Sequence, residues 1–190
     1  MKEVVLYIAM SLDGYIADKN GGVGWLCGDG SDTKNDGSYL DFVQTIDAVI
    51  LGYKTYHQII TELSPAAWVY ANKKSYVITH NKLESSDEII FTDKNLVDLI
   101  TEIKSENKKD IWICGGAAIA NQLIDLDLID RFCISVIPTI LGDGIRLFDT
   151  REKAIDLKLI STQSYNGITD LVYKRRKGAY NYLKQLKLGT

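Results

Sequence analysis

Short apolar runs rich in β-branched residues alternate along this chain with segments of helical periodicity. The apolar runs predict strands, and the segments with apolar residues three or four positions apart predict helices. The expected strands are residues 2–10, 47–51, 75–79, 88–91, 110–114 and 131–138, and the expected helices are residues 39–45, 55–63, 94–107 and 117–126. Such alternation is typical of an α/β protein with a mostly parallel sheet and helices on both faces.

The last third of the chain has strand-like runs without a helical segment between them. Two further strand-like runs, 157–164 and 169–175, flank Asn166-Gly167, a dipeptide that favours a tight hairpin. The sequence therefore predicts a three-layer α/β fold whose central sheet is mostly parallel and closes with a C-terminal antiparallel hairpin. At about 150 residues per domain, 190 residues make one domain, expected at 1–177, with 178–190 as a tail or short helix.

Composition places the chain among soluble globular proteins. Hydrophobic residues are 46% and charged residues 25%, which excludes disorder for most of the chain. No apolar run reaches the roughly 20 residues that a membrane helix needs, and residues 1–10 do not have the pattern of a signal peptide. We therefore expect a cytoplasmic protein without a membrane partner.

Charge and metal-ligand content exclude two further classes. The net charge is −3, so the basic excess of a nucleic-acid-binding protein is missing, and we interpret the basic run 174–177 as a solvated strand end. Three cysteines without a zinc or redox spacing and only two histidines predict no metal site.

A long polar segment, residues 18–37, separates the first strand region from the first helix. A loop of this length inside a compact domain is more often functional than not. Its large apolar residues include Trp25, which either lines a pocket as a stacking wall or anchors the loop in the core.

Three predicted strand ends carry groups suited to a phosphate or a nucleotide. The run Cys114-Gly115-Gly116-Ala117-Ala118 leads from a strand through two glycines into a helix, whose free N–H groups favour an anion. Gly52-Tyr53-Lys54-Thr55 repeats this strand–glycine–helix order, and Thr79-His80-Asn81 ends a third strand in polar groups. Ligands of open α/β sheets bind beyond the carboxyl ends of parallel strands, so these segments together favour a dinucleotide over a simple turn function.

Four motifs in this order resemble the dihydrofolate reductase-like superfamily. They are residues 8–17, 47–56, 113–117 and 138–148, and the resemblance covers about residues 2–176. Within the superfamily the chain is most similar to the C-terminal reductase domain of the bifunctional riboflavin-biosynthesis deaminase–reductase and to its stand-alone relatives. The zinc motifs of the deaminase half, His-x-Glu and Cys-x-x-Cys, do not occur in the sequence.

The resemblance implies an NADPH-dependent reductase that transfers a hydride to a small pteridine- or pyrimidine-type substrate, as 5-amino-6-(5-phosphoribosylamino)uracil reductase does. A dihydrofolate or pteridine reductase and a non-catalytic nucleotide-binding module are the alternatives. Relatives often dimerise, so a homodimer is expected. The residues that the resemblance assigns to the cofactor are Ala9, Ile16, Gly52, Tyr53, Lys54, Thr55, Thr79, His80, Asn81, Gly115, Gly116, Ala117 and Ala118.

One departure from the pattern affects the choice of cofactor. Tyr53 stands where relatives carry arginine, whose planar guanidinium would pair with the 2′-phosphate of NADPH. Lys54 is the residue that could replace this charge, so the preference for NADPH over NADH depends on it.

Dihydrofolate reductases hold their substrate with one buried carboxylate on the helix after the tryptophan loop. By its spacing ahead of Gly52 we expect Asp36 in this role, with Asp32 and Asp41 as alternatives. Asp13 either orients a substrate or fixes the turn after the first strand, and Trp25 completes the expected catalytic group.

Overall fold

The computed structural model describes residues 2–35 and 37–176. Its strands are β1 (Val4–Ser11), β2 (Tyr15–Ala17), β3 (Ile46–Gly52), β4 (Lys74–Ile78), β5 (Ile89–Thr92), β6 (Asp110–Gly115), β7 (Arg131–Ile137), β8 (Ile145–Arg146), β9 (Leu157–Tyr165) and β10 (Ile168–Arg175). Its helices are α1 (Tyr39–Gln44), α2 (Tyr53–Gln58), the π-helical turn η1 (Ile59–Leu63), α3 (Leu96–Glu106) and α4 (Ala117–Asp125). The expected elements are thus confirmed, whereas the predicted tail 178–190 lies outside the described residues.

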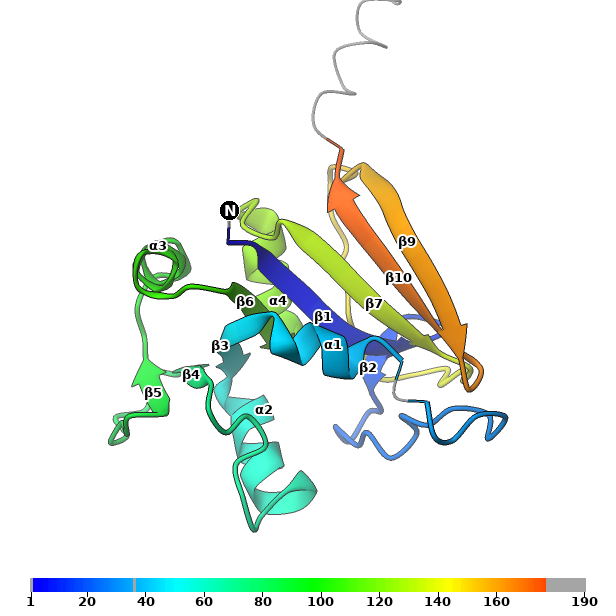
Figure 1. Ribbon diagram of the computed structural model, residues 1–190, viewed down its shortest axis with the longest axis horizontal. Coiled ribbons are helices and arrows are strands. Elements are labelled where there is room, and N and C mark those ends of the chain that lie inside the picture. The colour runs from blue at the N-terminus through cyan, green and yellow to red at the C-terminus, as the bar shows by residue number, and fades with distance from the viewer. Residues whose placement is uncertain (1, 36, 177–190) are drawn as a thin grey trace, which may run out of the picture.

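The eight-stranded main sheet runs in the order β5-β4-β3-β6-β1-β7-β10-β9 (Figure 1). All neighbours from β5 to β7 are parallel, and β10 and β9 add an antiparallel hairpin. The short strands β2 and β8 form a separate two-stranded ribbon, which the sequence pattern did not predict. The expected α/β architecture with a C-terminal hairpin is confirmed.

The sheet is buried on both faces, which explains why its central strands are almost continuously apolar. On one face Val4 and Leu6 of β1 pack with α3 and α4, and on the other Val5 packs with α1 and the α2–η1 segment. Full burial of such a side chain contributes roughly 1.5–3 kcal/mol. The two cores therefore fix the direction of β1, β3 and β6, and with it the position of their carboxyl ends.

Two of these carboxyl ends carry the glycines noted in the sequence. β3 ends at Gly52 and leads into α2, whereas β6 ends at Gly115 and leads through Gly116 into α4. Gly115 has φ +129°, a conformation that side chains other than glycine rarely adopt. Because β3 and β6 are neighbours, both helices begin at the same edge of the sheet.

The hairpin β9–β10 turns at Asn166 and Gly167, which both have positive φ as a tight turn requires. β9 is the outermost strand, and most of its residues are exposed. Among residues 2–35 and 37–176, the longest helix is the 11-residue α3, and none has the length and apolar content to cross a bilayer.

Candidate active site

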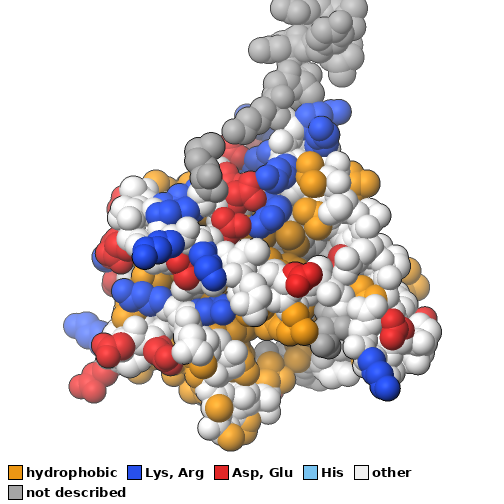
Figure 2. Space-filling view, viewed as in Figure 1, with side chains coloured by type: hydrophobic (Ala, Val, Ile, Leu, Met, Phe, Trp, Pro, Cys, Tyr) orange, Lys and Arg blue, Asp and Glu red, His pale blue; other side chains and the backbone are white. Residues whose placement is uncertain are grey.

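A cavity of about 1150 Å³ opens at the carboxyl edge of the sheet. Its walls are β1 and β2, the loop of residues 18–26, Tyr39 at the start of α1, the α2–η1 segment and the start of α4. In Figure 2 the surface is indented between the lobe that carries α2 and the lobe that carries the loop. This volume is slightly above the roughly 300–1,000 Å³ that is usual for small-molecule and cofactor pockets.

Two helix N-termini converge at one side of the cavity. Gly52 precedes α2 and Gly116 precedes α4, and neither helix start has a side-chain cap. A Cβ atom added at Gly116 would lie 3.3 Å from Oγ1 of Thr55, and one added at Gly52 would lie 3.9 Å from the backbone nitrogen of Gly116. We name Gly52, Thr55, Gly116 and Ala117 the phosphate cradle, because uncapped N–H groups at two helix starts suit an anion with two phosphate groups.

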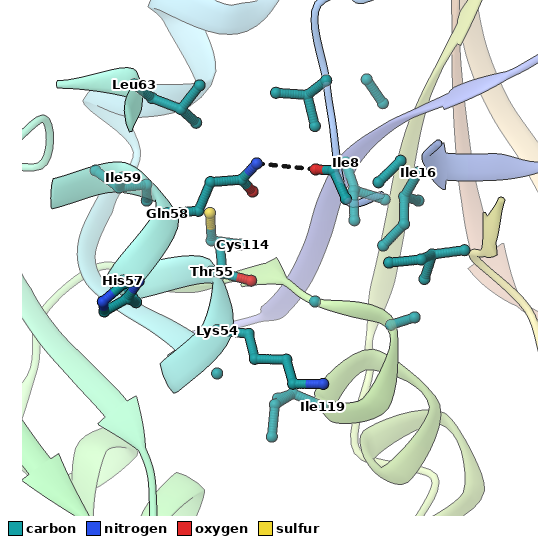
Figure 3. A pocket seen from close by; sticks show the side chains of 18 of the residues that line it. Ile8, Ile16, Lys54, Thr55, His57, Gln58, Ile59, Leu63, Cys114 and Ile119 are labelled. Atoms are coloured by element: carbon teal, nitrogen blue, oxygen red, sulfur yellow. Dashed lines mark hydrogen bonds between the residues drawn. The ribbon is translucent and has the colours of Figure 1, made fainter. Parts of the chain in front are cut away.

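The side chains around the cradle come from α2. Lys54 is exposed and extends toward the start of α4, whereas His57 points to the opposite side of α2 (Figure 3). The ring of Tyr53 packs against Tyr56 and His57, with centroid separations of 6.1 and 5.9 Å. Lys54 therefore provides a positive charge beside the cradle, and Tyr53 provides a flat ring at the position where the resemblance implies arginine.

The structure brings together most of the residues predicted for the cofactor. Those that line the cavity are Ala9, Ile16, Gly52, Tyr53, Lys54, Thr55, Gly116, Ala117 and Ala118. The others, Gly115, Thr79, His80 and Asn81, are not among the lining residues. Thr79 accepts a hydrogen bond of 3.0 Å from the backbone N–H of Asn81, so this segment forms a turn after β4, with His80 and Asn81 exposed.

The predicted carboxylates that the structure describes, Asp13, Asp32 and Asp41, do not line the cavity. Asp13 accepts a 2.6 Å hydrogen bond from the Ser11 hydroxyl and two more from the backbone N–H groups of Leu141 and Gly142. The Ser11 bond is the main cause that lowers the pKa of Asp13 to about 2. Asp13 therefore stays ionised at neutral pH and fixes the turn and the loop, the second of its two predicted roles.

Of the other predicted acids, Asp32 and Asp41 are exposed, and Asp36 lies outside the described residues. Trp25 also contributes nothing to the cavity wall. Its indole N–H donates to the Gly22 carbonyl over 3.2 Å, which holds the loop together, while Val23 and Leu26 on either side of it line the cavity.

Sequence reasoning missed a contact across the mouth of the cavity. Nε2 of Gln58 donates a 2.8 Å hydrogen bond to the carbonyl oxygen of Gly21, as the dashed line in Figure 3 marks. This bond ties the loop 18–26 to α2. The loop is thereby held over the site and shields part of the cavity from water.

Four aromatic residues from outside α2 also line the cavity. Tyr7, Tyr39, Tyr70 and Trp112 all line it, and we name these four residues the aromatic wall. The Tyr70 hydroxyl lies 3.0 Å from Sγ of Cys114, and burial raises the pKa of this thiol to about 11, so Cys114 is not a nucleophile at neutral pH. The sequence showed no motif here because the four rings come from β1, α1, β6 and the segment before β4.

The sheet order, the C-terminal hairpin and this cavity define a dihydrofolate reductase-like fold. The chain belongs to the family described as RibD C-terminal domain, whose sequence pattern matches residues 2–173. It is 38% identical over 177 residues to the uncharacterized protein YwjB of Bacillus subtilis (strain 168), covering 92% of this chain and 98% of that protein. The family is one of reductase domains.

Solved structures agree with this assignment. A putative riboflavin biosynthesis protein from Shewanella sp. PV-4 superposes with a TM-score of 0.79 at 28% identity, over 92% of this chain and 99% of that one. Dihydrofolate reductase from Enterococcus faecalis, complexed with NADP(H), gives a TM-score of 0.66 at 17% identity, over 92% and 97%. Because the identity to the dihydrofolate reductase is only 17%, that similarity establishes the fold and not the function.

Proposed function

We propose that this protein is an NADPH-dependent reductase that transfers a hydride to a pteridine- or pyrimidine-type substrate, similar to 5-amino-6-(5-phosphoribosylamino)uracil reductase. The observation that carries the proposal is the convergence of two uncapped helix starts on a cavity that is also lined by four aromatic residues from other elements. The cradle suits the pyrophosphate of a dinucleotide. The aromatic wall suits a flat ring beside it.

Each part of the cavity has a task in such a reaction. The bound cofactor would supply the hydride. The backbone N–H groups at Gly116 and Ala117 bind the phosphates, and Ala9 and Ile16 border the nicotinamide. The aromatic wall holds the acceptor ring face to face with it, which converts hydride transfer into a reaction between positioned partners. The loop tied down by Gln58 excludes water.

The cofactor preference rests on Lys54. The 2′-phosphate distinguishes NADPH from NADH, and a cationic side chain is the group that recognises it. Lys54 is the cation nearest the cradle on α2, whereas Tyr53 offers the adenine a ring to stack on. We therefore propose NADPH with Lys54 as the residue that selects it.

The decisive experiment follows the absorbance of reduced nicotinamide. The protein is mixed with NADPH or NADH and a panel of 7,8-dihydrofolate, other pteridines and ribosylaminopyrimidines. Loss of absorbance with a ribosylaminopyrimidine supports the proposal, and loss with dihydrofolate alone supports the pteridine alternative. Tight NADPH binding without turnover of any member would identify a nucleotide-binding module instead.

We also propose a homodimer in the cytoplasm. β9 is an edge strand with Leu157, Leu159 and Ile160 exposed, which suits pairing with a second copy. The three cysteines are all free, as is usual in a reducing compartment. Lys174 and Arg176 form ion pairs with Glu3 and Asp156, which supports a protein without a nucleic-acid partner.

A further inference from the structure

Asp170 is a carboxylate buried in the sheet beside the cavity. It lies on β10 and is only 4% exposed. The register places it opposite Ser135 of β7, which in turn lies opposite Ala9 of β1, so all three side chains share one face of the sheet. Ala9 lines the cavity. A carboxylate at such a depth is costly unless hydrogen bonds hold its charge.

The partners of Asp170 are three hydroxyl groups. Ser38 donates to Oδ2 over 2.6 Å, Ser135 donates to Oδ1 over 2.6 Å, and Tyr165 donates to Oδ1 over 3.3 Å. None of the ion pairs within residues 2–35 and 37–176 includes Asp170. A buried carboxylate held by hydroxyl groups from three separate parts of the chain is a fully hydrogen-bonded polar network and a candidate functional group.

The hydrogen bonds give this network a direction. The Ser38 hydroxyl has one proton, which it donates to Asp170, so toward Tyr7 its oxygen can only accept. The Tyr7 hydroxyl lies 3.1 Å from that oxygen and is therefore the donor. Burial raises the pKa of Tyr7, and the charge of Asp170 raises it further, so the phenol keeps its proton at neutral pH. The remaining lone pair of the Tyr7 hydroxyl oxygen can accept a hydrogen bond.

Tyr7 lines the cavity as part of the aromatic wall. Two of the neighbouring polar groups have partners: the Trp112 indole N–H donates to the Tyr7 carbonyl over 2.9 Å, and the Tyr70 hydroxyl lies against Cys114. The charged residues that line the cavity, Lys19, Lys54 and Glu62, come from the loop and the α2–η1 segment instead. A ring that packs on the wall thus meets an oriented oxygen.

We propose that Asp170, acting through Ser38, fixes the phenol oxygen of Tyr7 as a hydrogen-bond acceptor and thereby selects substrates whose ring carries an N–H donor, such as an aminopyrimidine. This inference rests on the proposed function and adds a specificity-determining pair to it. Tyr7 touches the substrate, and Asp170 is a positioning residue. The carboxylate is supplied by the C-terminal hairpin, far along the chain from the acids that sequence spacing suggested.

The test compares two neutral probes that differ in one group. Binding of 2-aminopyrimidine and of 2-methoxypyrimidine is measured by chemical-shift titration at pH 8, without cofactor. The wild type is expected to favour the amino compound by about 5- to 10-fold, the contribution of one hydrogen bond. Tyr7→Phe, which keeps the ring, should lose this preference.

Asp170→Asn provides an independent variant. Its amide nitrogen can donate to Ser38, which turns the Ser38 proton toward Tyr7 and the Tyr7 proton into the cavity. The preference for the amino compound should then disappear or reverse. Ser164→Ala removes an exposed hydroxyl from the same hairpin, one that contacts Thr169 instead, and should behave as the wild type. Circular dichroism of each variant checks folding, and Tyr7→Phe remains decisive if Asp170→Asn unfolds.

A second titration distinguishes failure of this inference from failure of the proposed function. NADPH is titrated separately by quenching of tryptophan fluorescence, and both Tyr7→Phe and Asp170→Asn should bind it as the wild type does. If NADPH binds but the wild type shows no preference between the probes, or Tyr7→Phe retains it, the inference is overturned. If the preference is present but NADPH does not bind, the proposed function fails and the ring-recognition site stands.

Discussion

Gly116 faces Thr55 across the cradle so closely that a Cβ atom on the glycine would lie 3.3 Å from the threonine hydroxyl. The absence of a side chain at Gly116 therefore keeps two helix starts together and leaves their N–H groups accessible. Any side chain here occupies the space that a phosphate would need.

Replacing Gly116 with aspartate should abolish cofactor binding while leaving the fold intact. The backbone at Gly116 is extended, as at helix N-caps, and aspartate is a good N-cap, so its carboxylate would occupy the N–H groups of α4 and repel the pyrophosphate. We expect NADPH affinity to fall at least about 100-fold, since two charge-assisted hydrogen bonds are lost. Fluorescence titration measures this. Ala154→Asp, which adds the same charge on an exposed loop, is the control and should bind normally.

Lys54→Gln should weaken NADPH binding by about 5- to 10-fold and leave NADH binding nearly unchanged, because only NADPH has the 2′-phosphate. The loss should shrink as salt is added, since Lys54 is exposed and its interaction is screened. The ratio of the two dissociation constants is the quantity to compare. Equal losses for both dinucleotides would show that Lys54 does not recognise the 2′-phosphate.

Asp13→Asn should change the pH dependence of stability. The pKa of Asp13 is lowered to about 2 in the folded protein, below its ordinary value of about 3.9, so ionised Asp13 stabilises the fold. This contribution is complete above about pH 4 and is lost as the pH falls through the folded pKa. Urea unfolding should therefore show the wild type more stable than Asp13→Asn at pH 5, with the difference vanishing toward pH 2. A difference that does not depend on pH would contradict the prediction.

Gln58→Ala should release the loop over the cavity. It removes the bond to the Gly21 carbonyl, whose net contribution is about 1 kcal/mol. Amide exchange in residues 20–26 should become roughly 5-fold faster, and NADPH should dissociate faster by a similar factor. Thr61→Ala, which removes an exposed side-chain bond in η1, is a matched control. Unchanged exchange in Gln58→Ala would mean that other contacts hold the loop.

Leu159→Lys tests the proposed dimer. A charge on this half-exposed position of β9 should prevent two edge strands from pairing, and sedimentation equilibrium should show a monomer. Thr162→Lys places the same charge on an exposed position of the same strand as a comparison. A wild type that is already monomeric would refute the dimer itself.

The fold could be predicted almost completely from local patterns. Apolar runs marked the strands, and Asn166-Gly167 marked the hairpin. The cradle was also predictable, because the order strand, glycine, helix can be recognised from consecutive residues of the sequence. The π-helical turn η1 after α2 was not predictable, because nothing in residues 59–63 distinguishes a π-helical turn from an α-helix.

The polar part of the site was less predictable because it depends on which strands become neighbours. The distance from Gly52 pointed to Asp36, which lies outside the described residues. Among the described residues a buried carboxylate is Asp170, which meets Ser38 only because β10 lies beside β7. Its one sequence signal was a charged residue at an inward position between Ile168 and Val172. Thr79 to Asn81 followed a strand as predicted, yet the chain turns away from the cavity there.

The position of β10 between β7 and β9 also determines the order in which the site is completed during synthesis. A ribosome that has reached the end of β7 has already produced both glycine turns and all four aromatic rings, but the carboxylate that orients Tyr7 is still untranslated. If the proposed roles hold, the residues of the cradle are synthesised before the residue that would confer selectivity.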